Sequence, residues 1–139
     1  MKALLSGLVS ACWLSVAAPA AAHHAFAAEF DINRPVSLVG KVTRLEWTNP
    51  HAWLFLQAKD EKGELQDWSV ELVGINDLLR LGWGRDRVKE GDEVSVAGYR
   101  ARNDTNTANA AAVRLTASGE LLWESVAQSR QEGRERRSR

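Results

Sequence analysis

Alternating apolar and polar positions recur along the central part of the chain and predict a protein built mainly of β-strands. The alternation is clearest at residues 65–72, where Trp68 and Val70 fall on one face and Asp67 and Glu71 on the other. A period of two is typical of a strand with one buried face and one solvated face. We therefore expect Trp68 in the core and Glu71 in solvent.

Other segments also have strand patterns. They are residues 36–42, 52–58, 93–100 and 110–115, with a short extra strand predicted at 120–123. In the first of them the apolar parity slips after Gly40, toward Leu45 and Trp47, which indicates a bulge or a sharp bend. Polar turns separate the strands: residues 60–63 (DEKG) are typical of a hairpin and residues 102–107 of a loop.

One short helix is predicted between the third and fourth strands. Asn76 is a suitable cap, Leu78 and Leu79 give the helix an apolar face, and Gly82 is a natural stop. Three strands, a helix and two strands in this order are typical of the OB-fold. We therefore predict an all-β fold, a small five-stranded OB-like barrel over residues 36–124. Another small barrel or a sandwich is the alternative.

The first 22 residues have the pattern of a secretory signal. Lys2 gives a positive start, residues 3–18 are almost wholly apolar, and the alanines that follow Pro19 supply an A-x-A cleavage site. We expect residues 1–22 to be removed and the protein to be periplasmic or secreted. The alternative interpretation, a retained membrane helix, has less support, because the apolar run is shorter than the about 20 residues that are needed to span a bilayer.

Cys12 offers a second alternative for the start of the chain. It ends the stretch VSAC, which resembles a lipobox, so lipidation at this residue would anchor the protein. If Cys12 leaves with the signal, the mature protein has no cysteine and therefore no disulfide or thiol chemistry.

Charge narrows the choice of partners. The chain has 18 basic and 18 acidic residues, so removal of Lys2 leaves one negative charge in excess. This balance lacks the basic footprint of a nucleic-acid-binding protein. Residues 23–35 are predicted as an N-terminal arm and residues 125–139 as a polar, arginine-rich, disordered tail, which makes a cell-envelope polymer a candidate partner.

The histidines carry the clearest chemical hint. Cleavage after Ala22 would expose His23, whose amine and imidazole would chelate copper with His51 as a third nitrogen. Cleavage one residue earlier would place His24 third, and the amine, two amides and an imidazole would then surround Cu(II) or Ni(II) in a square plane. Both geometries need neutral imidazole, so binding should weaken below about pH 6. The alternative is that the pair is a soluble spacer.

Two loops are predicted to flank the usual ligand face of an OB-fold, residues 48–51 and 100–109. The polar side chains expected to converge there are Asn49, His51, Arg102, Asn106 and Asn109. Trp47 and Trp53 bracket the first loop, where exposed rings would stack on sugars or bases. The alternatives are an ordinary asparagine-stabilised turn and tryptophans that belong to the core.

No catalytic signature accompanies these residues. Two acidic residues would serve as an acid–base pair only if the fold brought them together. The candidates are Glu29, Asp31, Glu46 and Glu71, and their spacing is that of solvated faces. We therefore predict a module that binds a metal or small ligand rather than an enzyme. A binder of saccharide or polymer through Trp47, Trp53 and the 102–109 loop is the first alternative, and a small hydrolase is the second.

Four motifs resemble those of a family of small exported bacterial proteins. They are HHAFAAEFD at residues 23–31, EWTNPHAW at 46–53, GDEVSVAGY at 91–99 and NTANA at 106–110. The family is catalogued as domain of unknown function 6152, and the resemblance covers about residues 23–123. It implies a periplasmic, OB-like module without an assigned reaction, and it supplies no catalytic residues.

Overall fold

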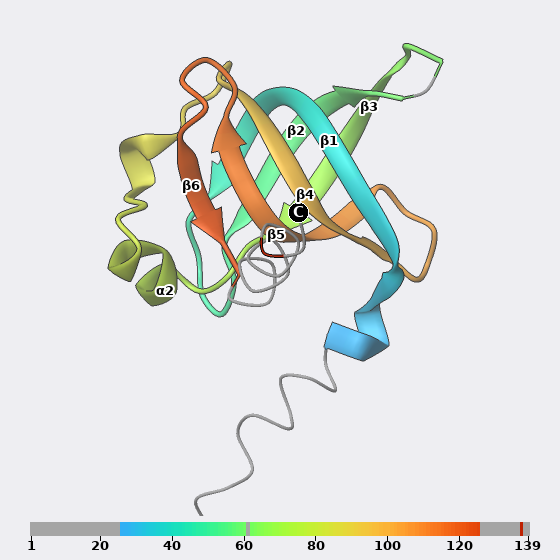
Figure 1. Ribbon diagram of the computed structural model, residues 1–139, viewed down its shortest axis with the longest axis horizontal. Coiled ribbons are helices and arrows are strands. Elements are labelled where there is room, and N and C mark those ends of the chain that lie inside the picture. Colours follow the sequence, from blue (N-terminus) through green and yellow to red (C-terminus); the bar gives the residue numbers. More distant parts are fainter. Residues whose placement is uncertain (1–25, 61, 126–136, 138–139) are drawn as a thin grey trace, which may run out of the picture.

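A computed structural model describes residues 26–60, 62–125 and 137 of the protein (Figure 1). Its elements are β1 (Phe30–Glu46), β2 (Trp53–Lys59), β3 (Leu65–Glu71), α2 (Ile75–Arg80), the 3₁₀ turn η1 (Arg85–Arg87), β4 (Glu93–Ala101), β5 (Thr107–Leu115) and β6 (Leu121–Glu124). The predicted signal peptide, His23, His24 and nearly all of the arginine-rich tail lie outside the described residues. In the described part, no helix has the length and apolar character needed to cross a membrane.

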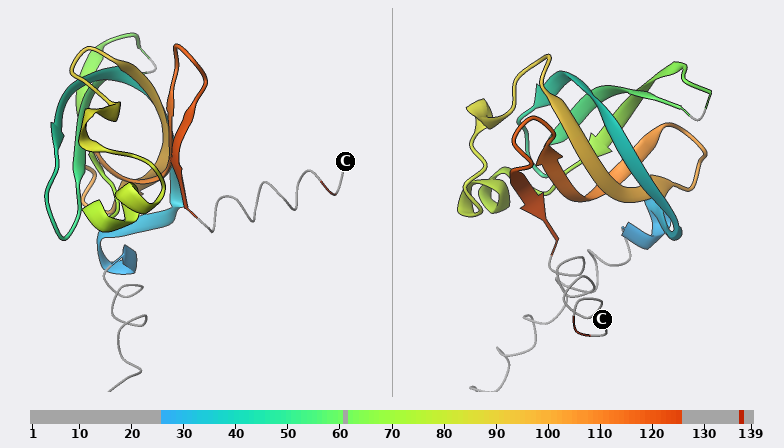
Figure 2. Two further views of the ribbon diagram at one scale, coloured as in Figure 1. Left: turned by 90° about the vertical axis from the view of Figure 1, so that its left-hand side faces the viewer. Right: turned by 45° about the horizontal axis from the view of Figure 1, so that its top comes forward.

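The strands form a closed ring. Their order in the sheet is β3-β2-β1-β4-β5-β6, and β3 also pairs with β5 in parallel, through Ser69–Thr107 and Glu71–Asn109. This second pairing closes the first five strands on themselves, while β6 continues the sheet from β5 outside the ring (Figure 2). The predicted OB-like barrel with a short helix between β3 and β4 is therefore confirmed.

Strand β1 is long because it pairs with two neighbours. Its first half lies against β4 and its second half against β2, and Gly40 pairs with both. The predicted bulge is present as a register shift between Val42 and Arg44, two residues beyond this glycine. The strand begins at Phe30, so it includes residues 30–35, the last part of the segment predicted as an N-terminal arm.

The core fills the ring and is closed at one end by the helical segment. The strands contribute the fully buried side chains Val42, Leu54, Leu56, Val70, Val94, Val96 and Val113. Leu78 of α2 and Trp83, which follows it, are 0% and 1% exposed and pack in the same cluster. Helix α2 therefore covers one end of the barrel, on the left in Figure 1.

The prediction that Trp68 is a core residue is wrong in its degree of burial. Trp68 faces inward with Val70, but it is half-buried and only packs against the edge of the core. It lies in the middle of β3, two residues before the fully buried Val70. The buried tryptophans are instead Trp83 and Trp123, which are 1% and 6% exposed.

Candidate functional site

Glu71 is the one charged residue that the described part of the chain buries, with 6% of its surface exposed. The prediction that it faces solvent is therefore wrong. Its position on the outward side of β3 agrees with the alternation, but side chains from β5 and from the loop before β2 cover it. Periodicity along one strand cannot show what neighbouring segments place over its outward face.

Both carboxylate oxygens of Glu71 have hydrogen-bond partners, as a buried charge requires. His51 Nδ1 donates a short hydrogen bond to Oε1, and Asn109 Nδ2 donates to Oε2 over 3.3 Å. Since a carboxylate only accepts, Nδ1 carries the hydrogen, and a neutral His51 ring has its lone pair on Nε2. Among the described residues Nε2 has no partner, and half of the His51 side chain is exposed.

Strand register places this cluster in a line across the outer face of the barrel. Trp53 is paired with Glu71, Glu71 with Asn109, and Asn109 with Tyr99. We call these four residues the outer row. Phe26, the first described residue, packs edge-on against Tyr99 with ring centroids 6.0 Å apart. The start of the described chain therefore lies at one end of the outer row.

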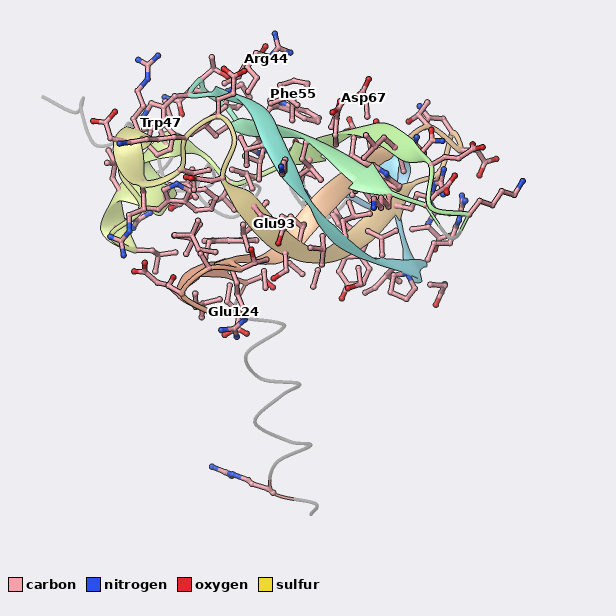
Figure 3. All side chains as sticks on the ribbon, turned by 90° about the horizontal axis from the view of Figure 1, so that it is seen from above. Arg44, Trp47, Phe55, Asp67, Glu93 and Glu124 are labelled. Carbon is pink, nitrogen blue, oxygen red and sulfur yellow. The ribbon has the colours of Figure 1, made fainter. Side chains whose placement is uncertain are left out.

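The outer side of the sheet continues from the outer row onto β1. The guanidinium of Arg44 lies 4.0 Å from the centroid of the Phe55 ring, and the same side chain forms a 3.0 Å ion pair with Glu46. Figure 3 shows Arg44, Phe55 and Asp67 on this side of the sheet. Trp47, like Trp68, is half-buried and packs against the edge of the core.

The loop that carries His51 is held against the segment before α2. Ala52 forms backbone hydrogen bonds with Leu72 and Val73, and the side-chain oxygen of Asn49 accepts from Ile75 N over 3.3 Å. Asn49 therefore stabilises the start of the helix rather than facing the outer row. These contacts fix the position from which His51 reaches Glu71.

Two other predicted site residues lie away from His51. Arg102 Nε donates to the carbonyl oxygen of Ala27 over 2.8 Å and its guanidinium lies 3.6 Å from Asp31. Asn106 accepts a 3.0 Å hydrogen bond from Arg100. Of the five polar residues expected to converge, the structure brings together only His51 and Asn109.

Glu71 is the central residue of this cluster, and the sequence analysis considered it only among four acidic residues and did not place it with His51. The sequence contains a signal for this contact. A hairpin centred on residues 60–64 sets Trp53 opposite Glu71, and His51 comes two residues before Trp53. In the described residues no group of three or more histidine, cysteine or acidic side chains is arranged to hold a metal ion. His51 is the one histidine within the described part of the molecule.

Comparison with known proteins identifies the family. The mitochondrial single-stranded DNA binding protein Rim1 from S. cerevisiae has a similar structure, with a TM-score of 0.46 and 15% sequence identity over 59% of this chain and 93% of that one. No curated protein matches the sequence. The profile of a family of unknown function, DUF6152, matches residues 11–110. The chain belongs to the DUF6152 family.

Proposed function

We propose that the protein is an exported module that binds Cu(II) or Ni(II) through His51 and does not catalyse a reaction. The observation that supports this is the buried Glu71 carboxylate, which holds Nδ1 and leaves Nε2 available. Metal-binding histidines commonly donate their second ring nitrogen to a carboxylate, which fixes the ring and raises its basicity. Imidazole nitrogen also suits both ions.

The other ligands would come from the start of the mature chain. Phe26 packs on Tyr99, and Glu71 lies two strands farther along the outer row, or about 10 Å at the usual strand spacing. The three residues from His23 to Phe26 span at most about 10 Å when extended. The amine of the first residue, His23 or Ala22, and the imidazole of His23 or His24 would then supply the other ligands of a metal bound at His51.

The mass of the mature protein tests where that chain begins. We expect protein recovered from the periplasm of an expressing bacterium to begin at His23 or Ala22, because the alanines before the histidine pair form the cleavage site. Intact mass spectrometry distinguishes these two starts, and each selects one of the two metal geometries. An uncleaved chain, or one lipidated at Cys12, would contradict the proposed amino-terminal ligands.

Copper titration of the mature protein tests the site itself. We expect one equivalent of Cu(II) to give a visible absorption band that His51→Ala changes in position or intensity. Glu71→Gln should weaken Cu(II) binding by about 10- to 100-fold, as loss of a partner behind a ligand usually does. Asp67→Asn is the matched control, since this exposed carboxylate lies on the same side of β3. The proposal fails if neither His24→Ala nor His51→Ala alters the band.

A further inference from the structure

A groove of about 460 Å³ opens at the end of the barrel away from α2. It lies between the β2–β3 hairpin and the β4–β5 loop, which project from the same end of the barrel in both Figure 1 and Figure 2. Its volume falls within the range of small-molecule sites, about 300–1,000 Å³. Its lining combines apolar side chains, amides and cations, a mixture that also lines small-molecule sites.

We propose that this groove binds a short acidic saccharide. The apolar part of the lining comes from Val36, Leu38 and Trp68. Trp68 is only half-buried and lines the groove, so its ring offers an apolar surface to a ligand there. The C–H face of a sugar ring would pack on such a surface, since a flat indole ring can cover much of it.

Arg100 supplies a cation whose position is fixed before any ligand binds. Its guanidinium lies 5.2 Å from the Trp68 ring centroid. Nε donates to Thr105 O over 3.3 Å, and Nη2 donates to Asp104 O over 3.2 Å and to the Asn106 side chain over 3.0 Å. Nη1 has no partner among the described residues and remains available to a carboxylate of the ligand. A charge-assisted hydrogen bond from a fixed guanidinium is one of the stronger polar contacts.

The remaining charges of the groove favour an anion. Lys59 and Lys62 also line it, and neither ammonium group forms an ion pair in the described structure. The acidic residue of the lining, Asp60, accepts from the backbone N–H groups of Lys62 and Glu64, each over 2.9 Å, so its carboxylate stabilises the hairpin turn. The described lining residues therefore leave two positive charges in excess.

The amides distinguish a saccharide from other anions. Gln66 Nε2 donates to Asp60 Oδ2 over 3.3 Å, and Asn106 Oδ1 accepts from Arg100, so each amide keeps a further N–H that suits a hydroxyl group of the ligand. A single tryptophan matches one sugar ring, whereas strands of nucleic acid stack on successive aromatic rings. The groove is separate from the His51 cluster, because Trp68 and Glu71 lie on opposite faces of β3. It also differs from the surface around Trp47 and Trp53 considered from the sequence.

Titration with trigalacturonic acid tests this proposal in the full-length mature protein. We expect calorimetry to detect binding of trigalacturonic acid. The neutral trisaccharide of galactose should bind at least about tenfold more weakly. The double variant Lys59→Gln/Lys62→Gln should lower the affinity for trigalacturonic acid about tenfold, because it loses two charge contacts. Binding should also change the tryptophan fluorescence of the protein, and Trp68→Leu should abolish that change. Lys41→Gln is the control, since this exposed lysine of β1 does not line the groove.

Several results would overturn the assignment. Equal affinity for the neutral and acidic trisaccharides, or an unchanged affinity in the double lysine variant, would show that the groove does not read the anionic groups. Tighter binding of a thymidine trinucleotide than of trigalacturonic acid would replace the saccharide with a nucleic acid. The lysines are exposed, so the double variant should fold even if Trp68→Leu does not.

Discussion

Gly98→Ala is expected to destabilise the protein by about 3 kcal/mol, at the upper end of what overpacking usually costs. A Cβ at this position would lie 2.3 Å from the carbonyl oxygen of Asn109 and 3.1 Å from its carbon. These are backbone atoms of the paired strand β5, so no side chain can rotate away to relieve the contact. Gly98 also borders the register shift between β4 and β5, where the two backbones approach closely.

Urea unfolding followed by tryptophan fluorescence would measure this loss, with Gly84→Ala as the matched control. Nothing lies within 4 Å of a Cβ built on Gly84, and its φ of −85° suits any residue. The control should therefore change the free energy of unfolding by less than about 0.5 kcal/mol. Equal stability of the two variants would contradict the close approach of β4 and β5. Since Asn109 bonds Glu71, Gly98→Ala should also disturb the outer row.

Trp83→Ala is expected to cost about 3–5 kcal/mol, the usual range for removal of a buried aromatic side chain. Trp83 is 1% exposed and packs with Leu78 where the helical segment closes the barrel. Its Nε1–H has no hydrogen-bond partner in the described structure. Trp83→Phe should therefore cost less than half as much, because it removes an unsatisfied donor, worth about 1–3 kcal/mol, together with part of the ring.

Thermal and urea unfolding of the two variants test this ordering. Leu79→Ala is the control, because Leu79 lies on the same helix and is 53% exposed, so its loss should change stability by less than about 0.5 kcal/mol. A loss from Trp83→Phe equal to that from Trp83→Ala would indicate that the indole N–H is paired in solution. A small loss from Trp83→Ala would mean that α2 does not close the core.

The order of strands could be predicted because its signals are local. Alternation in residues 65–72, the turn at 60–63 and the short helix before Gly82 each depend on neighbours in sequence, and the structure contains all three. The inward positions of Val94 and Val96 follow from the same period and are fully buried. Local patterns therefore determined the elements, and the few ways of closing them into a barrel determined the fold.

The candidate site could be predicted only in part, because it depends on contacts between distant segments. Glu71 and Asn109 are 38 residues apart in sequence, and no local pattern shows that β3 and β5 are neighbours. Arg102 and Asn106 do not join His51 because each has another partner. Arg102 bonds Ala27, which is 75 residues away in sequence, so no local pattern could show it, whereas Asn106 bonds Arg100 at the start of its own loop. Polar residues in a loop satisfy local hydrogen bonds before they are available to a ligand.

The short parallel pairing of β3 with β5 also links folding to binding. The outer row draws on β2, β3, β5 and β4, so it does not exist until the last of these strands joins the ring. A chain that has formed only its first hairpin holds Trp53 and Glu71 but lacks Asn109. An ion bound at His51 would therefore favour the closed ring over partly folded chains, and the protein's melting temperature should rise with free ion concentration.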